Sequence, residues 1–375
     1  MTTLSVAAFG LVFLSITGYG QDQKIVASPF ELTWTKGRCV GCKTAARLGE
    51  IQFVSHSEVW AVGSEDHLGG VNTIIVHSTD AGRTWREVPQ TRQYTDPDAQ
   101  QAFSFLDVAH GWVESWGNLA GDPEMISTKD GGQHWQSLSQ QLLQRMQFVD
   151  GIHGYGTVAD EFFRTDDGGR TWVKTKIPDI GFIEGMVFLT PDNGWIAGID
   201  GKDLLVFRTV NGGRVWEESR TTPPQPLDRV RDLFFFDQLH GWLITWNHIG
   251  EGSYLYSTVD GGKHWTLDPD LSFQGKDKMV IVVRFTSRER GFVFLEGNGQ
   301  SRLAYTTDGG THWSNQVLPR FVNHCQVFAV DVMCSARFHL LTLHPMVTAL
   351  KPRTRTALSQ AIFEEQLKKD SWKPS

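Results

Sequence analysis

Six short turns in this chain carry an acid, or its amide, at a fixed place, and they are the first residues whose types and spacing could do chemistry. In each copy a Ser or Thr lies two residues before the acid, a Gly two residues after it and a Trp five residues after it. The copies are Asp80, Gly82 and Trp85; Asp130, Gly132 and Trp135; Asp167, Gly169 and Trp172; Asn211, Gly213 and Trp216; Asp260, Gly262 and Trp265; and Asp308, Gly310 and Trp313. Recurring carboxylates could bind a metal ion or transfer protons.

The copy with Asn211 favours a structural role instead. Asn keeps the acceptor oxygen of Asp and loses only its charge, so a cap that accepts backbone N–H bonds from its own turn survives the change. The Gly supplies the positive φ that a tight turn between strands requires. The Trp is expected to bury its ring between neighbouring sheets. We therefore interpret this turn, an Asp box, as a structural part, and we predict no catalytic residue, metal or cofactor.

An enzyme is the alternative to this structural interpretation. A sialidase-like exo-glycosidase needs arginines around the substrate carboxylate, a Tyr nucleophile paired with a Glu, and an Asp that acts as acid and base. Tyr94 lies in a polar loop with Asp96 and Asp98, which we interpret as a surface loop. The sequence has no phosphate-binding loop, no His-Glu-x-x-His motif and no Gly-x-Ser-x-Gly elbow. A carbohydrate-binding or small-ligand-binding module is a further alternative.

Histidines and cysteines offer two other kinds of site. His110, His153 and His240 occupy equivalent turns, where a ring of imidazoles could sense pH or bind metal, but we expect turn residues with satisfied hydrogen bonds. The four cysteines are Cys39, Cys42, Cys325 and Cys334. Their spacing is poor for zinc, and a redox pair is usually found at a helix N-terminus. We predict structural disulfides or free thiols, and the connectivity stays open because four cysteines allow three pairings.

The elements that position these residues form a longer repeat. Successive box tryptophans lie 50, 37, 44, 49 and 48 residues apart, which suits one four-stranded propeller blade per repeat. A second motif, an apolar strand followed by a polar turn, a Gly and an aromatic residue, lies between the boxes. Its copies end at Gly111-Trp112, Gly154-Tyr155, Gly194-Trp195, Gly241-Trp242 and Gly291-Phe292. The fold class is therefore all-β, a β-propeller of four-stranded blades.

Both ends of the chain contain partial repeats. Trp34 precedes Trp60 by 26 residues, as Trp216 precedes Trp242, so it stands where a box Trp is expected. We predict that segments 24–27 and 30–35 pair with 327–331 and 337–343 to give a seventh blade, which would remove exposed sheet edges. Six blades with loose ends are the alternative. Segment 346–375 does not repeat and is expected to be a solvated tail or to contain a short helix over 357–369.

Composition and the N-terminus bound the location and the partners. The formal net charge of −7 does not favour nucleic acid as a partner. The apolar run 4–16, followed by small residues before Gln21, predicts a signal peptide over 1–20, a propeller over 21–345 and export to the periplasm or the extracellular space. No later stretch is long and apolar enough for a membrane span. The chain is expected to be a monomer.

The two motifs together resemble those of the Ycf48/HCF136-like proteins, most clearly where Phe234–Trp242 is followed by Thr258–Trp265. The resemblance covers roughly residues 30–343. It implies a seven-bladed propeller and a protein-binding scaffold, since the photosynthetic members of the family act in photosystem II assembly. Those members bind clients through a basic surface patch, which the sequence does not map onto particular positions here. We accordingly predict a non-enzymatic scaffold that binds a protein or an extended ligand on one face, with 90–101 and 246–252 as candidate loops.

Overall fold

The computed structural model describes the backbone of residues 23–27, 30–35, 38–40, 47–55, 57–67, 70–80, 83–88, 93–95, 102–116, 123–223, 229–247, 252–271, 273–274, 279–297, 300–317, 325–328, 331–334 and 339–345. Side chains are described for most of these residues between 52 and 317. The predicted signal peptide, the C-terminal tail and its helix, and most of the loop 90–101 lie outside the described residues. All regular elements in the described segments are β-strands, and no helix among them is long and apolar enough to cross a membrane.

The strands form six four-stranded antiparallel blades, as expected for a β-propeller. Blade 1 contains β4 (Arg47–Phe53), β5 (Val59–His67), β6 (Gly70–Ser78) and β7 (Thr84–Glu87); β3 (Arg38–Val40) adds parallel to β7, and β8 (Gln93–Thr95) pairs with β6. Blade 2 contains β9 (Phe103–Phe105), β10 (Gly111–Trp116), β11 (Pro123–Thr128) and β12 (Gln136–Ser139). Blade 3 contains β13 (Arg145–Phe148), β14 (Gly154–Val158), β15 (Glu161–Thr165) and β16 (Val173–Lys176).

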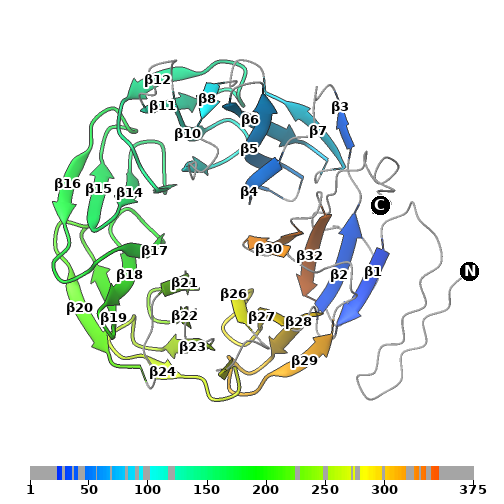
Figure 1. The fold of residues 1–375 in the computed structure, drawn as a ribbon, viewed down its shortest axis with the longest axis vertical. Helices are drawn as coiled ribbons and strands as arrows, with labels where there is room; N and C mark the ends of the chain where they lie inside the picture. Colours follow the sequence, from blue (N-terminus) through cyan, green and yellow to red (C-terminus); the bar gives the residue numbers. More distant parts are fainter. Residues whose placement is uncertain are drawn as a thin grey trace, which may run out of the picture. The chain divides into compact units, whose positions relative to one another are not determined.

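Blade 4 contains β17 (Ile183–Phe188), β18 (Gly194–Asp200), β19 (Asp203–Thr209) and β20 (Glu217–Thr221). Blade 5 contains β21 (Arg229–Phe235), β22 (Gly241–Asn247), β23 (Gly252–Thr258) and β24 (Thr266–Leu267), and β25 (Phe273–Gln274) also pairs with β23. Blade 6 contains β26 (Met279–Phe285), β27 (Gly291–Gly297), β28 (Gln300–Thr306) and β29 (Ser314–Val317). The chain divides into two compact units, and the larger, residues 67–73 and 92–323, holds blades 2 to 6. Within this unit the blades follow one another along an arc (Figure 1). The first strands of blades 4, 5 and 6, which are β17, β21 and β26, lie on the inner side of this arc.

Strands from both ends of the chain meet in a further sheet, here called the terminal sheet. It contains β1 (Gln23–Ala27), β2 (Phe30–Thr35), β32 (His339–Pro345), β31 (Asp331–Cys334) and β30 (Cys325–Phe328), in that order. β2 pairs with β32 from Phe30–Pro345 to Thr35–Leu340, which is the pairing of the two ends expected from the sequence. One detail of the prediction was wrong. Segment 327–331 is not one strand, because β30 ends at Phe328 and β31 begins at Asp331, so the sheet has five strands.

Aromatic side chains hold successive blades together. The first strand of each blade ends in a Phe, and the aromatic residue that follows the Gly in one blade stacks on this Phe in the next. The pairs are Trp112 on Phe148, Tyr155 on Phe188, Trp195 on Phe235 and Trp242 on Phe285, with ring centroids 3.5–3.9 Å apart. Two of the indoles also donate to the next blade, Trp112 to the carbonyl of Gly168 and Trp195 to that of Gly261. Such pairs add specific geometry to the large apolar area that they bury.

The same Phe explains the Gly of the second motif. In blade 4, Gly194 lies directly across from Phe188, and a Cβ placed on it would lie 2.3 Å from that ring. The Gly of each of blades 2, 3, 5 and 6 faces its own Phe at a similar distance. A side chain at this position would displace the ring that the neighbouring blade stacks on. The second motif is therefore a packing motif.

Polar side chains join the first strands of adjacent blades, whose inner edges have no further strand to pair with. The Ser104 hydroxyl accepts the Phe148 N–H at 2.9 Å, and the Gln147 amide both accepts from and donates to the backbone of Phe188. The Glu184 carboxylate accepts the Val230 N–H at 2.6 Å, and Asp232 accepts the Val283 N–H at 3.0 Å. These bonds satisfy backbone groups that an exposed strand edge would leave open.

Candidate protein-binding surface

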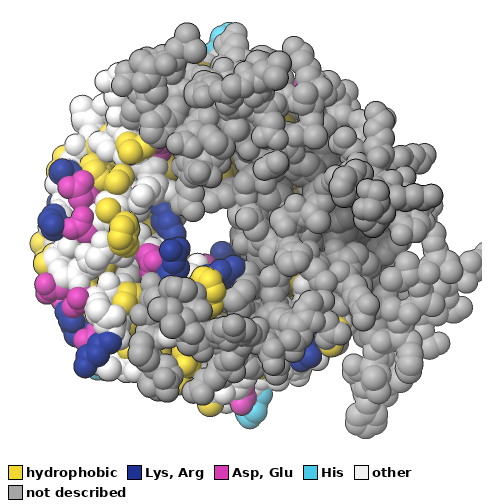
Figure 2. All heavy atoms as spheres, in the orientation of Figure 1, with side chains coloured by type: hydrophobic (Ala, Val, Ile, Leu, Met, Phe, Trp, Pro, Cys, Tyr) yellow, Lys and Arg dark blue, Asp and Glu magenta, His cyan; other side chains and the backbone are white. Residues whose placement is uncertain are grey.

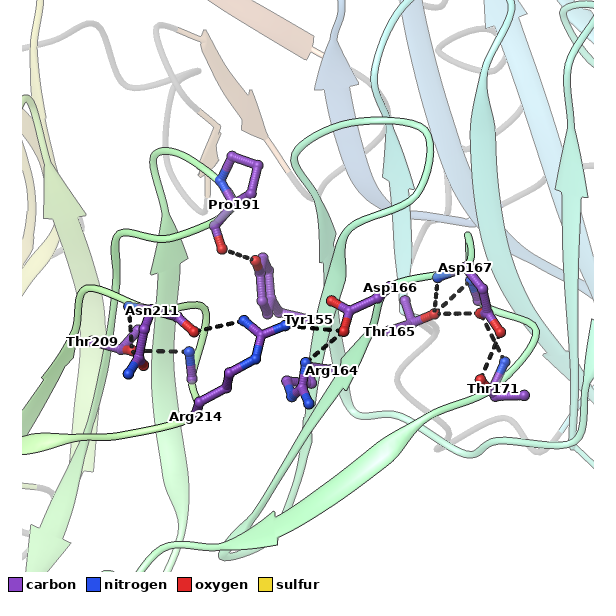
Figure 3. Close-up of polar contacts among 12 residues, drawn as sticks. Tyr155, Arg164, Thr165, Asp166, Asp167, Thr171, Pro191, Thr209, Asn211 and Arg214 are labelled. Carbon is purple, nitrogen blue, oxygen red and sulfur yellow. Dashed lines mark hydrogen bonds and ion pairs between the residues drawn. The ribbon is translucent and has the colours of Figure 1, made fainter.

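Each Asp box closes its own turn with hydrogen bonds. In blade 3, Asp167 Oδ1 accepts the backbone N–H groups of Arg170 and Thr171 at 3.0 and 2.9 Å, and Oδ2 accepts the Thr171 hydroxyl at 2.6 Å. Thr165 donates its hydroxyl to Asp167 at 2.8 Å and accepts the Gly169 N–H at 3.0 Å (Figure 3). Gly169 has a φ of +91°, which favours glycine. The carboxylate oxygens are thus engaged by the turn itself.

The other described boxes repeat this geometry. Oδ1 of the acid accepts the backbone N–H four residues later in Asp80, Asp130, Asp260 and Asp308, at 2.7, 2.9, 3.1 and 3.0 Å. The amide oxygen of Asn211 accepts the Val215 N–H at 2.9 Å in the same way. The backbone N–H of His134, and then its side chain, hold the pKa of Asp130 at about 2, and His312 does the same for Asp308. Gly82 lies outside the described residues, whereas Gly132, Gly213, Gly262 and Gly310 all have positive φ.

The box tryptophans lie nearer the surface than the sequence suggested. Trp85 and Trp265 are buried, but Trp135, Trp172, Trp216 and Trp313 are only partly buried. The rings of Trp172, Trp216, Trp265 and Trp313 meet the first-strand Phe of their own blade edge-on, with centroids 5.9–6.2 Å apart. The deepest aromatic positions belong instead to the second motif. The box indole therefore completes the interface between blades from its outer side.

The histidines of the equivalent turns are paired with acids of the same turns. Nδ1 of His110, His153 and His240 lies 3.0, 2.7 and 2.8 Å from the carboxylates of Asp107, Asp150 and Asp237. Those acids also accept backbone N–H groups, as a turn cap does. Among the residues whose side chains are described, no group of three or more His, Cys, Asp or Glu is placed to bind a metal ion.

Three of the tyrosines have structural surroundings. Tyr155 is buried in its stack on Phe188 and donates its hydroxyl to the Pro191 carbonyl (Figure 3). Tyr254 and Tyr256 are buried in the core between blades 4 and 5, and burial raises the pKa of both phenols. A nucleophile has to reach its substrate, and none of these three does. Tyr94 is part of β8, and its side chain lies outside the described residues, as do Asp96 and Asp98.

A charged network joins blades 3 and 4 at the box turns. Asp166 Oδ2 accepts from Arg164 of its own blade at 2.6 Å and from Arg214 of the next box at 3.2 Å. Arg214 also donates to the Asn211 carbonyl at 2.8 Å (Figure 3). Because Asp166 and Arg214 are about half exposed, at 48% and 50%, water screens the pair and its contribution to stability is small. This network belongs to the scaffold.

Two adjacent first strands, β17 and β21, each contain a bulge. The ladder between β21 and β22 pairs Val230 and Asp232 but passes over Arg231, and the ladder between β17 and β18 passes over Glu184 in the same way. A bulge inserts one extra residue and re-aims its side chain. Each of the two residues lies four positions before the Phe that ends its strand. The sequence analysis did not single out this position, although the constant offset from Phe is visible in the repeat.

Phe182, Glu184, Arg229 and Arg231 together form what we call the bulge cluster. Phe182 directly precedes β17 and is 59% exposed, and Arg229 and Arg231 are exposed on β21. The bond from the Val230 N–H to Glu184 brings the beginnings of these two strands together. Figure 2 shows Lys and Arg side chains, with acidic and apolar ones beside them, along the inner side of the larger unit. The cluster thus contains two exposed arginines, an exposed aromatic ring and a carboxylate that accepts a backbone N–H.

The remaining predicted positions are only partly described. Cys39 lies on β3, Cys325 on β30 and Cys334 on β31, and their side chains, like all of Cys42, lie outside the described residues. Residues 248–251 of the second candidate loop are likewise outside. The disulfides and these loops therefore stay predictions.

Comparison with known proteins agrees with the fold and the motifs. No family model matches the chain. The photosystem II assembly lipoprotein Ycf48 of Synechococcus sp. (strain CC9902) is 24% identical over 257 residues, which cover 64% of this chain and 68% of that protein. The structure described as YCF48 bound to D1 peptide superposes with a TM-score of 0.58 at 18% identity, covering 86% of this chain and 97% of that one. A xyloglucanase from Xanthomonas campestris has a TM-score of 0.52 at 14% identity, covering 82% of this chain and 53% of that one, and shares the fold alone.

Fold and turns together define the class of protein as an Asp-box β-propeller. Within this class, the chain is similar in sequence to Ycf48 and shares the fold of the YCF48 structure.

Proposed function

We propose that this chain is a non-enzymatic, exported scaffold that binds an extended segment of another protein at the bulge cluster. The observation that carries the proposal is the exposure of Phe182, directly before β17, and of Arg229 and Arg231 on the adjoining strand β21. The similarity to an assembly lipoprotein, and to a propeller whose structure is described with a bound peptide, supports a protein as the partner.

The chemistry of the cluster indicates the kind of segment. Guanidinium groups bind carboxylates through two parallel N–H bonds, and an exposed Phe favours an apolar side chain. The Glu184 carboxylate, which accepts the Val230 N–H, lies at the same place on the two adjoining strands. A segment with acidic and apolar side chains fits this arrangement. The rigid ladders beneath the cluster reduce the entropy lost on binding.

A matched pair of charge reversals tests this proposal. Arg229→Glu/Arg231→Glu changes the cluster, whereas Lys174→Glu/Lys176→Glu makes the same charge change on the outer strand β16. A photo-crosslinking residue in place of Phe182 first identifies the bound protein in the native envelope, with the same residue in place of the exposed Val173 as control. We expect the cluster double variant to weaken binding of that protein at least about tenfold, as the loss of a hot spot does. Equal affinities of the two double variants would overturn the proposal.

An exo-glycosidase is the competing function, because propellers with that chemistry share the fold. The engaged hydroxyl of Tyr155 and the burial of Tyr254 and Tyr256 favour the scaffold. A screen of the purified chain against fluorogenic glycosides, including sialosides, separates the two. Turnover that survives the cluster double variant would favour the hydrolase.

A further inference from the structure

A hairpin of the terminal sheet brings two of the four cysteines to opposite positions. β30 and β31 are antiparallel neighbours, and their register pairs Phe328 with Asp331 at one end and Cys325 with Cys334 at the other. Sequence spacing allows three pairings of the cysteines. The strand register favours one of these pairings, because it places Cys325 directly opposite Cys334.

The hydrogen-bonding pattern of this hairpin also suits a cross-link. Only two residues separate Phe328 from Asp331, so this pair has to exchange its own backbone hydrogen bonds across the turn. Bonded and non-bonded pairs alternate along an antiparallel ladder, which makes Cys325–Cys334 a non-hydrogen-bonded pair. The Cα atoms of such a pair lie about 4.5 Å apart, within the range of about 4.4–6.8 Å that disulfides span.

From this register we infer that Cys325 and Cys334 form an intrachain disulfide across the β30–β31 hairpin. The reaction is exchange with the disulfide of a thiol oxidoreductase. One cysteine thiolate attacks that disulfide and forms a mixed disulfide, and the second thiolate then displaces the oxidoreductase. The two cysteine thiols give up two protons and an electron pair, and the oxidoreductase is released as a dithiol.

The place of the hairpin in the fold explains why a cross-link would matter. In the terminal sheet, β30 is an edge strand of four residues with β31 as its one neighbour. The two residues between the strands are Ala and Val in the sequence, and neither is the Gly or Asn that two-residue hairpin connections favour. A covalent bond at the open end of the hairpin compensates for both weaknesses. β31 in turn pairs with β32, which pairs with β2 near the N-terminus, so the bond would stabilise the sheet that joins the two ends.

Peptide mapping of the full chain tests the pairing directly. Formation of the bond in the cell rests on the proposed export, so the purified, reduced chain is treated with an oxidised thiol oxidoreductase, then alkylated and digested with trypsin without reduction. Cleavage after Arg320 and Arg337 leaves both cysteines in peptide 321–337, whereas Cys39 and Cys42 fall in peptide 39–43. We expect peptide 321–337 to carry no alkyl group and to be two hydrogen atoms lighter than the dithiol. Two alkyl groups on it, or a link to peptide 39–43, would overturn the inference.

Two single variants complete the test. Cys334→Ser should expose Cys325 to alkylation and lower the urea midpoint relative to the oxidised, but not the reduced, wild-type chain. Cys42→Ser, the matched control, should leave the link within peptide 321–337 intact. Equal midpoints for the Cys334→Ser variant and the oxidised wild-type chain would show that the bond does not stabilise the sheet.

Discussion

Tyr155 of blade 3 lies flat on Phe188 of blade 4, with ring centroids 3.5 Å apart and ring planes 5° apart. The tyrosine also donates its hydroxyl to the Pro191 carbonyl in the turn that follows Phe188. On its other side the Phe ring covers Gly194 of its own blade. One Phe thus joins a glycine of its own sheet to an aromatic residue of the preceding one, and three other blade interfaces of the larger unit repeat this stack.

Gly194→Ala should therefore destabilise the chain. The new methyl group would lie 2.3 Å from the Phe188 ring, which cannot move away because Tyr155 is stacked on it. We expect a loss of about 1–3 kcal/mol in the free energy of unfolding, measured by urea titration. Gly151→Ala is the control, since a Cβ there meets no atom within 4 Å. Equal losses in the two variants would contradict the packing role of the glycine.

The Asp box should tolerate an amide and not an alanine. Asp260→Ala removes the acceptor for the His264 N–H and should cost about 1–2 kcal/mol of unfolding free energy, as other lost caps do. Asp260→Asn should keep most of that stability, since Asn211 caps its own turn through its amide oxygen. Loss of partner binding in folded Asp260→Ala protein, without loss of stability, would contradict a capping role.

The same residue sets a dependence on acid. Burial opposes ionisation of Asp260, but hydrogen bonds from the His264 side chain and backbone outweigh it and lower the pKa to about 2. A depressed native pKa stabilises the fold above the ordinary value of 3.8, and this contribution is lost as the pH falls towards 2. Urea midpoints between pH 5 and pH 2 should therefore fall less steeply for Asp260→Asn than for the wild-type chain.

Glu114 should give the opposite dependence at higher pH. Burial raises its pKa from 4.5 to about 8, against the opposing effect of a bond accepted from the Leu143 N–H. The native state then keeps a proton that the unfolded state releases, so stability falls as the pH rises from about 4.5 to 8, by an amount on the order of a few kcal/mol. Glu114→Gln should remove this slope in urea midpoints measured from pH 5 to pH 8.5. Glu217→Gln, on the exposed strand β20, should leave it unchanged.

Two acids that bind an Arg should differ in importance according to their exposure. Asp166→Ala breaks the half-exposed network between blades 3 and 4 and should cost less than about 1 kcal/mol of unfolding free energy. Asp232→Ala should cost about 2–4 kcal/mol, because Asp232 is 14% exposed and its loss leaves the Val283 N–H and the Arg284 guanidinium without this acceptor. Similar losses in the two variants would show that burial does not decide the difference.

The sequence predicted the fold class well because each blade repeats the same two short motifs. Turn residues such as Asp260 and Gly262 form their hydrogen bonds and backbone conformation within a single turn. Their spacing in the sequence was therefore enough to locate the hairpins. The pairing of Phe30–Thr35 with the last strand was also predictable, since the partial repeats at the two ends complement each other. Segment 327–331 was interpreted wrongly because residues 329 and 330, Ala and Val, are not residue types that indicate a break between two strands in a sequence.

The candidate site was not predictable in the same way. Arg231 lies in an ordinary alternating strand by sequence, and only the ladder to β22 reveals that it is the extra residue of a bulge. Likewise, the net charge of −7 is a sum over the whole chain, so it does not show where exposed arginines gather. A pattern read along one strand does not contain the register to the next.

The bulged position of the first strands affects how a propeller of this kind can change the partner that it binds. Gly49, Glu184, Arg231 and Ile281 are each passed over by the ladder of their own blade, and each lies four residues before the closing Phe. The same position in the repeat thus holds a glycine, an acid, a base and an aliphatic residue, while the register shift of the ladder recurs in all four blades. Because the same bulge forms with four different side chains at this position, a substitution there can change recognition in one blade while the strand pairing is kept.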